Sequence, residues 1–460
     1  MASPHFIPHT YCYPYCTILP AEATTKNTKI VNYLNFFILF LAKDFFYVIV
    51  KLTDQFYKGG YPMSEKIQWI MNTMTASADK HLALLKQEEV QKVRAFHAGF
   101  PQYEPTPLVN LPRMAGHLGI RELCIKDESW RFGLNAFKVL GGSYAMSRYI
   151  AEELGHPEEP LPYAELTSPE LHQKFGQAVF FSATDGNHGR GVAWSARQLG
   201  QKAVIFMPKG TTNARLKNIQ AEAAEVTIED MNYDACVRLA AEEAAKVPHG
   251  VVIQDTAWKG YEKIPSWIMQ GYSTMVDEAV EACSAPPTHV FVQAGVGSLA
   301  GAVTGYLANR FSPAPPRIIV VEAEAAACLY RSAAAGDGQP RIVEGDMETI
   351  MAGLACGEPN ITAWDILRNH ADCFLTLDDT TCARGMRMLA APLKGDAPVT
   401  SGESGASTFA ALAAILQKEE NMALRKALQL DGNSRVLLFS TEGNTDPERY
   451  ERIVWDGRGK

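Results

Sequence analysis

A lysine stands where a polar, glycine-containing stretch gives way to a helical pattern, in KDESWRFGLNAFKVLGGSYA, residues 126–145. Lys138 has apolar neighbours on both sides. Burial lowers the pKa of a lysine and makes its amine available for Schiff-base chemistry. For this residue alone, a lysine at a helix start whose ammonium reaches solvent is the alternative interpretation.

Two carboxylates follow apolar strand candidates farther along the chain. In SATDGNHGRG, residues 182–191, Asp185 and Asn187 occupy a tight polar turn that enters a helix. Free N–H groups at a helix start bind anions, although Asp185 could instead be a simple N-cap. In QDTAWKGYEKIPSWIMQGY, residues 254–272, Asp255 also follows a strand, and a cap or turn is again the alternative. We expect His188 to be structural or exposed to solvent.

A glycine-rich turn and a hydroxyl complete the set. The turn QAGVGSLAG, residues 293–301, lets the backbone approach a phosphate closely, and Ser298 adds a hydroxyl. It lacks both the G-x-G-x-x-G spacing of a dinucleotide site and the GKS or GKT ending of a nucleoside triphosphatase. In STEGNTD, residues 440–446, Thr441 carries a hydroxyl at a strand end, with a plain turn as the alternative.

The order of these features matches the needs of a pyridoxal phosphate (PLP) site. Such a site requires an amine for the aldehyde, N–H donors for the phosphate, and partners for the ring oxygen and the ring nitrogen. The lysine, the asparagine turn, the glycine-rich turn and the hydroxyl supply one each. We therefore predict PLP as the cofactor and no metal.

Strands and helices must bring these turns together. Strand candidates are residues 122–126, 178–182, 202–207, 225–229, 250–254, 289–293, 317–322, 372–376 and 435–440, with helices between them such as 188–199, 231–246, 265–282 and 405–419. This alternation predicts an α/β fold with mostly parallel sheets, and ligands bind such sheets at the carboxyl ends of strands. We expect a helix over residues 64–100, because Ile67, Ile70, Met71 and Met74 recur at helical spacing.

Composition bounds the class of protein. The 460 residues suggest two to three domains, and 47% hydrophobic with 20% charged residues is typical of a globular chain. Lys and Arg number 43 against 51 Asp and Glu, a net charge of −8, which argues against a nucleic-acid binder. Nine cysteines without a CxxC pair indicate a reducing compartment, and we expect a cytoplasmic protein.

The first 62 residues have a different composition. The apolar run from Ile30 to Val50 is interrupted by Lys43 and Asp44, which disfavours a membrane span. The segment has neither the basic start of a secretory signal nor the arginines of a mitochondrial leader. We interpret residues 1–62 as an extension outside the catalytic unit.

Several long motifs, taken in order, resemble fold-type-II PLP enzymes, the group of threonine dehydratase, serine racemase and the tryptophan synthase β-subunit. More narrowly the chain resembles the diaminopropionate ammonia-lyase family from about residue 103 to 455. The segments that carry this resemblance are KDESWRFGLNAFKVLGGSYA, ATDGNHGRG, QDTAWKGYEKIPSWIMQGY, ETIMAGLACGEPN and STEGNTD.

The resemblance implies a role for each site residue. Lys138 would attach the cofactor covalently, Asn187 would bind its ring hydroxyl, and Thr441 would face the pyridine nitrogen. The phosphate would be bound by Gly295, Val296, Gly297, Ser298 and Leu299. Related dehydratases usually carry a serine where Asp185 stands, and this departure favours the lyase.

The carboxylates suit the lyase reaction. An ammonium leaving group can be held by a carboxylate, which can also act as a base toward the α-proton. The family implies that Asp185 takes this proton from the D-isomer of 2,3-diaminopropionate and Lys138 from the L-isomer, while Asp255 assists in binding or proton transfer. Elimination followed by hydrolysis would give pyruvate and two ammonia.

Two other functions stay open at this stage. A serine or threonine dehydratase would use the same framework, and a catalytically inactive scaffold would have no need of Lys138. The family implies a homodimer with PLP in a cleft between two domains. Residues 63–142 and 251–460 would form the large PLP-binding domain and residues 143–250 the small α/β domain. Whether Cys328 and Cys356 pair is not decided by the sequence.

Overall fold

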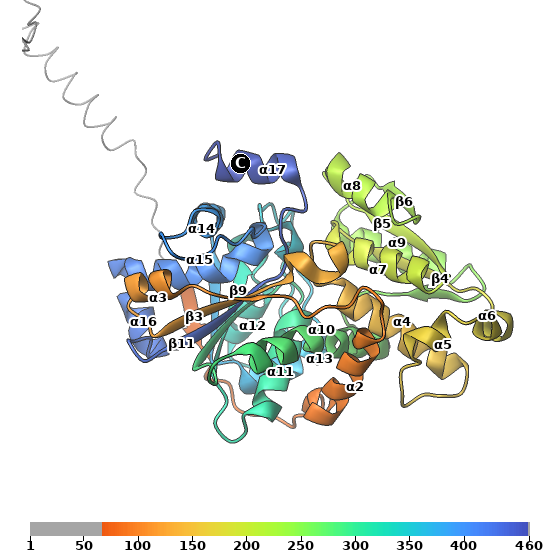
Figure 1. The fold of residues 1–460 in the computed structure, drawn as a ribbon, viewed down its shortest axis with the longest axis horizontal. Coiled ribbons are helices and arrows are strands. Elements are labelled where there is room, and N and C mark those ends of the chain that lie inside the picture. The colour runs from red at the N-terminus through yellow and green to blue at the C-terminus, as the bar shows by residue number, and fades with distance from the viewer. Residues whose placement is uncertain (1–66, 459–460) are drawn as a thin grey trace, which may run out of the picture. The chain divides into compact units, whose positions relative to one another are not determined.

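The computed structural model describes residues 67–458 of the chain (Figure 1). The extension predicted at residues 1–62 lies outside the described residues. Among the helices that are described, none is long and apolar enough to cross a membrane.

A seven-stranded sheet forms the centre of the larger part of the fold, in the order β1-β10-β9-β8-β11-β3-β2. The inner strands are parallel, and the edge strands β1 and β2 pair antiparallel with β10 and β3. The strands are β1 (Gln68–Met71), β2 (Leu108–Asn110), β3 (Glu122–Asp127), β8 (His289–Gln293), β9 (Arg317–Ala323), β10 (Cys373–Leu377) and β11 (Arg435–Ser440).

Helices cover both faces of this sheet, because alternate strand residues point to opposite sides. In β11, Val436 and Leu438 join one buried cluster and Leu437 and Phe439 the other. The first cluster packs against α3 (Pro112–Leu118), α14 (Asp379–Ala390), α15 (Glu403–Gln417), α16 (Met422–Leu428) and α17 (Pro447–Val454). The second packs against α2 (Gln87–Ala98), α10 (Lys263–Ala282), α11 (Ser298–Arg310), α12 (Cys328–Ala335) and α13 (Ile361–His370) (Figure 1).

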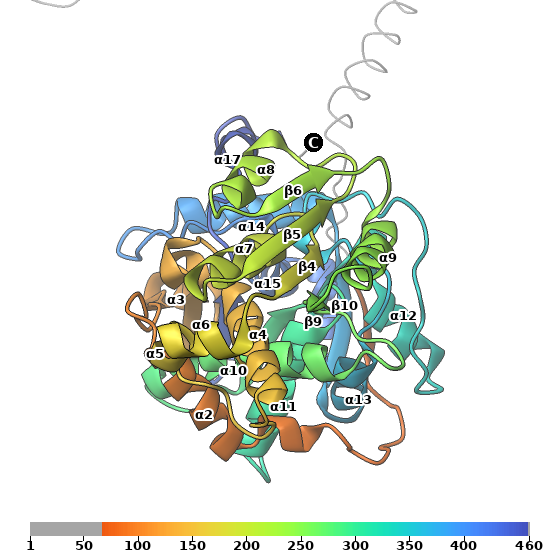
Figure 2. The ribbon, with the colours of Figure 1, turned by 90° about the vertical axis from the view of Figure 1, so that its right-hand side faces the viewer.

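A second, four-stranded parallel sheet has the order β6-β5-β4-β7. Figure 2 shows β5 between β4 and β6, with α9 beside them. Phe180 packs with α4 and α7, while its neighbour Phe181 packs with α9 on the other face. The elements are β4 (Val179–Ala183), β5 (Lys202–Met207), β6 (Glu225–Ile228), β7 (Gly250–Val252), α4 (Val139–Glu153), α5 (Tyr163–Leu166), α6 (Pro169–Phe175), α7 (Asn187–Gln198), α8 (Asn213–Gln220) and α9 (Tyr233–Ala244).

The predicted strands and helices agree with this structure to within two residues at each end, and the α/β fold with mostly parallel sheets is confirmed. The helix expected over residues 64–100 is wrong in its first half. Residues 68–71 form edge strand β1, and only Gln87–Ala98 is an α-helix. Ile67, Trp69 and Met71 pack on one core cluster and Ile70 on the other, so the period is that of a strand. The spacing of apolar residues in this segment fits either a helix or a strand. Pairing with the edge of β10 favours the strand.

Candidate active site

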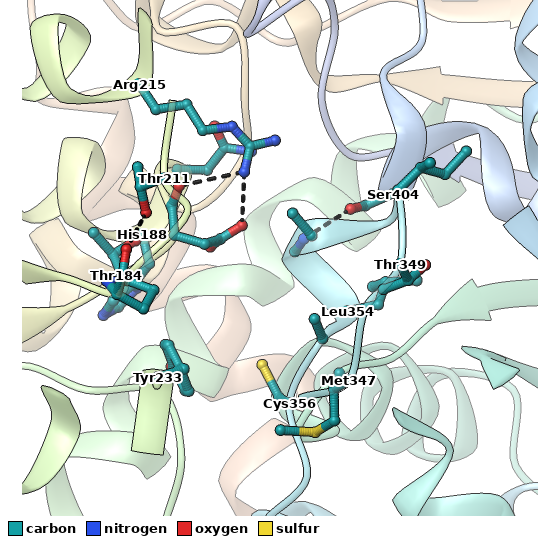
Figure 3. A pocket seen from close by; sticks show the side chains of 18 of the residues that line it. Thr184, His188, Thr211, Arg215, Tyr233, Met347, Thr349, Leu354, Cys356 and Ser404 are labelled. Carbon is teal, nitrogen blue, oxygen red and sulfur yellow. Dashed lines mark hydrogen bonds and ion pairs between the residues drawn. The ribbon is translucent and has the colours of Figure 1, made fainter. Parts of the chain in front are cut away.

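A cavity of about 1010 Å³ collects the turns at the strand ends of both sheets. Every residue predicted for the site lines it: Lys138, Asp185, Asn187, Asp255, Gly295, Val296, Gly297, Ser298, Leu299 and Thr441. Figure 3 shows Thr184, His188 and Arg215 on one side of this cavity, and Met347, Leu354, Cys356 and Ser404 on the other. Residues up to about 300 positions apart thus share one site because parallel strands end at the same edge.

A buried ion network fixes the segment that leads to Lys138. Glu278 on α10 accepts hydrogen bonds from Lys126 at 2.6 Å and from Arg131 at 2.7 Å. Arg131 also pairs with Glu128 at 2.8 Å. Burial raises the pKa of Glu278, but the two cations outweigh it and hold the pKa at about 2. A charged cluster this deep makes the approach to Lys138 rigid, since breaking one member leaves an unpaired buried charge.

Lys138 is the residue before α4, and its ammonium pairs with Asp255. The Nζ donates to Asp255 Oδ2, and the Tyr272 hydroxyl donates to the same oxygen at 3.3 Å. Burial lowers the pKa of Lys138, yet the Asp255 charge reverses this and raises the pKa above its ordinary value. Burial likewise raises the pKa of Asp255, and the Lys138 charge lowers it to about 2. The depressed lysine pKa expected from burial is therefore wrong for this state of the site.

Asp185 does not cap α7. The N–H groups of Gly186 and Gly189 donate instead to the Thr184 hydroxyl, at 2.9 and 3.0 Å. The Asp185 carboxylate is one-third exposed to the cavity and accepts a hydrogen bond at 3.1 Å from Arg215. The capping alternative is excluded, and the carboxylate is available for chemistry.

The glycine-rich turn ends at the N-terminus of α11. Gly297 precedes the helix with φ of +103°, a conformation that favours glycine. The first N–H groups of a helix have no partner within it and bind anions. The Ser298 hydroxyl donates to the backbone oxygen of Asp255, and the Asn360 amide donates to Ser298 Oγ at 2.8 Å and to that same backbone oxygen at 3.0 Å. Asn360 therefore links the glycine-rich turn to the turn that carries Asp255.

Thr441 is held by a buried amide. Gln293 Nε2 donates to Thr441 Oγ1 at 2.9 Å and to the backbone oxygens of Phe439 and Ser404 at 2.9 and 3.2 Å. Two carbonyl partners fix this end of the amide as the nitrogen. Since the Thr441 oxygen accepts a hydrogen bond from Gln293, the hydroxyl hydrogen is free to form a hydrogen bond with a ring nitrogen.

Asn187 and Glu442 form a second polar pair, which joins α7 to the end of β11. The Asn187 amide donates to one Glu442 oxygen, and the N–H of Ser404 donates to the other at 2.9 Å. The pair fixes the amide of Asn187 in the cavity. His188 is structural as expected, since its Nε2 contacts the backbone oxygen of Ile253 at 2.8 Å.

The sequence motifs did not single out the residues that hold the predicted site residues in place. Glu442, Gln293 and Asn360 lie inside or beside recognised motifs, so their position next to site residues was a usable signal. Tyr272, which contacts Asp255, likewise ends a recognised motif, whereas Arg215 lies outside every motif and contacts Asp185 only through the fold. Cys328 and Cys356 are both free thiols in the structure.

The donor set fits PLP. The cavity presents an amine, a helix N-terminus with a glycine-rich approach, an amide and a hydroxyl. A Cβ added to Gly295 would meet the backbone oxygen of Gly353 at 3.2 Å, so a side chain there would crowd this approach. Fold and site together define a PLP-dependent enzyme of fold type II.

Comparison with known proteins agrees. The family model "Pyridoxal-phosphate dependent enzyme" matches residues 100–442. Diaminopropionate ammonia-lyase of Salmonella typhimurium is 51% identical over 403 residues, covering 86% of this chain and all of the relative. That of Escherichia coli K12 is 47% identical over 379 residues, covering 82% of this chain and 93% of the relative. The solved Escherichia coli enzyme in complex with an aminoacrylate-PLP azomethine reaction intermediate is 44% identical with a TM-score of 0.76, covering 86% of this chain and 98% of that one.

The chain therefore belongs to the diaminopropionate ammonia-lyase family of PLP-dependent enzymes. This confirms the predicted family, fold class and cofactor, and the scaffold hypothesis is not supported.

Proposed function

We propose that this enzyme converts 2,3-diaminopropionate and water to pyruvate and two ammonia by α,β-elimination. The observation that supports this most directly is the pair of carboxylates, Asp185 and Asp255, that line one cavity with Lys138. A substrate with two amino groups needs negative charge in the site, because an amine leaves only as ammonium. The high identity to the Salmonella and Escherichia coli enzymes supports the same substrate.

Bound PLP supplies an electron sink that stabilises negative charge at the α-carbon of the substrate. Lys138 holds this cofactor covalently, the N–H groups of residues 295–299 bind its phosphate, and Asn187 binds its ring hydroxyl. The Thr441 hydroxyl would donate a hydrogen bond to the ring nitrogen, since its oxygen already accepts from Gln293. A hydroxyl, unlike a carboxylate, does not keep that nitrogen protonated, which favours prompt elimination over transamination.

The protein residues move the protons. Asp185 removes the α-proton of the D-isomer, and the Lys138 amine removes that of the L-isomer from the other face. Asp255 binds the departing ammonium and exchanges protons with Lys138, with which it pairs in the structure. The 2-aminoacrylate formed tautomerises and hydrolyses, which releases pyruvate and the second ammonia.

Separate assays of the two diaminopropionate isomers, serine and threonine test the proposal. We expect pyruvate release from diaminopropionate at a much higher rate than from the hydroxy amino acids. Pyruvate from serine or threonine, and none from either diaminopropionate isomer, would refute the lyase and favour a dehydratase. Turnover of the D-isomer should collapse in Asp185→Asn, and unchanged turnover would remove Asp185 from the mechanism.

We further infer a cytoplasmic homodimer with two domains in each subunit. The large domain comprises residues 63–142 and 251–460, and the small domain comprises residues 143–250. The division is supported by the two separate sheets, of which the smaller contains β4, β5 and β6 within residues 143–250 and β7 beginning at Gly250. Light scattering of the purified protein tests the dimer, and a single-subunit mass would contradict it.

A further inference from the structure

A buried arginine lies against Asp185, and neither the sequence motifs nor the proposed mechanism accounts for it. Arg215 Nη1 donates to Asp185 Oδ2 at 3.1 Å and to the Asp185 backbone oxygen at 3.3 Å. The Arg215 side chain is 9% exposed and that of Asp185 is 31% exposed. The carboxylate is therefore the partner that is open to the cavity, in which Figure 3 shows Arg215 and its hydrogen bonds.

The local structure directs this contact. Thr184 accepts the N–H groups of the turn, so Asp185 is not needed as a cap. Arg215 passes close to Gly186, where an added Cβ would meet its Cδ at 3.2 Å. Among the described residues, Asp185 Oδ1 has no hydrogen-bond partner, while Oδ2 is held by Arg215. One oxygen is thus fixed and the other is free to receive a proton.

Arg215 is also the charged group that contacts Asp185 directly. The other titratable groups near this carboxylate are His188 on α7, Tyr233 on α9 and Cys356 before α13. Burial lowers the pKa of His188 and raises the pKa values of Tyr233 and Cys356, so all three are neutral at pH 7.

Other charged groups near this corner pair with each other or interact with Arg215. Lys138 and Asp255 neutralise each other as an ion pair. Glu403, Glu442 and Asp446 contribute to the electrostatic field at Arg215, beside the larger contribution of Asp185. The guanidinium is thus the one permanent positive charge in direct contact with Asp185 among the residues that the structure describes.

We propose that Arg215 is a positioning residue that orients the Asp185 carboxylate and thereby sets the turnover of the D-isomer relative to the L-isomer. This rests on the proposed function, in which Asp185 serves the D-isomer and Lys138 the L-isomer. The two isomers then form an internal control, because a general defect in folding or cofactor binding slows both.

The test compares Arg215→Gln, which keeps donor groups without charge, with Arg215→Lys, which keeps the charge. In Arg215→Gln we expect kcat/KM for the D-isomer to fall about 10- to 100-fold and that for the L-isomer to change less than about threefold. Arg215→Lys should show a smaller selective fall for the D-isomer than Arg215→Gln, because the ammonium keeps a positive charge beside the carboxylate.

Arg197→Met is a matched control, since Arg197 pairs with Glu222 at 2.7 Å outside the cavity lining. An equal fall for both isomers, or no fall for the D-isomer, in cofactor-loaded Arg215→Gln overturns the proposal. If Arg215→Gln does not bind PLP, Arg215→Lys decides alone: a selective loss of D-isomer turnover supports the proposal, and an equal or absent loss overturns it. Absence of diaminopropionate turnover in the wild type refutes the proposed function instead, and full D-isomer turnover in Asp185→Asn refutes the role of Asp185.

Discussion

Replacing Asp255 by asparagine should accelerate the attachment of PLP to the apoenzyme while it slows turnover. An amine attacks an aldehyde only in its neutral form, and in the structure the Lys138 ammonium donates to the Asp255 carboxylate. The ion pair therefore holds the lysine in its unreactive form until the cofactor arrives. Asparagine leaves the backbone oxygen that anchors Ser298 and Asn360 in place.

The size of the effect follows from the balance of burial and charge. Burial lowers the pKa of Lys138, and the Asp255 charge reverses that shift. A contacting opposite charge shifts a pKa by about 1–3 units, which is about 1.4–4 kcal/mol. Without it, the fraction of neutral amine at a given pH below the pKa should rise about 10- to 1000-fold.

Stopped-flow absorbance after mixing apoenzyme with PLP measures this directly. The wild-type rate should climb about tenfold per pH unit from neutral pH to about pH 9.5, whereas the Asp255→Asn rate should start higher and level off sooner. Asp277→Asn is the control, because Asp277 is a buried carboxylate paired with Arg94 at 2.7 Å outside the cavity. Identical rates and pH profiles for wild type and Asp255→Asn would refute the reasoning.

Three other substitutions test the supports of the site. Glu278→Gln should lower the free energy of unfolding at pH 7 by about 3–5 kcal/mol. The pKa of Glu278 is held at about 2, below its ordinary 4.5. The difference in stability between wild type and variant should therefore persist above about pH 4.5 and shrink as the pH falls toward 2. Chemical denaturation at several pH values measures it, and a difference that stays constant would contradict this prediction. Asn360→Ala and Asn360→Asp should both raise the Kd for PLP about 5- to 150-fold in a fluorescence titration, because both lose the amide donor to Ser298. The aspartate can still cap α13. A wild-type Kd in Asn360→Asp would therefore show that the cap alone matters. Gln293→Leu should lower the free energy of unfolding by about 1–3 kcal/mol, because two buried backbone oxygens and Thr441 lose their hydrogen-bond donor. Chemical denaturation measures this change, and unchanged stability would argue against these hydrogen bonds.

The two carboxylates of the site have different partners. Asp255 neutralises Lys138 and contacts Tyr272, whereas Asp185 contacts a guanidinium that stays charged at every working pH. The two carboxylates therefore occupy different electrostatic environments within one cavity. Different environments allow two acid–base roles on the two faces of a substrate.

The sequence by itself determined the parts that depend on near neighbours. Runs of β-branched residues and amphipathic spacing are local, and they located the strands from residue 122 onward and the helices near residues 188–199, 231–246, 265–282 and 405–419. The turns at strand ends follow from this, because glycine and polar residues directly after an apolar strand must lie at one edge of a parallel sheet. The pattern failed at residues 68–71, where pairing with the edge of β10 decided between two periods.

Only the tertiary structure decided which side chains meet. Lys138 and Asp255 are 117 residues apart, and Asn187 and Glu442 are 255 apart, so no spacing along the chain relates them. Arg215 lies 30 residues from Asp185 and outside every recognised motif, so only the fold shows that the two meet. The tertiary structure also decided the direction of the pKa shift of Lys138. Burial lowers this pKa and the charge of Asp255 raises it, so the outcome depends on how deeply the lysine is buried and how close Asp255 lies in the folded chain.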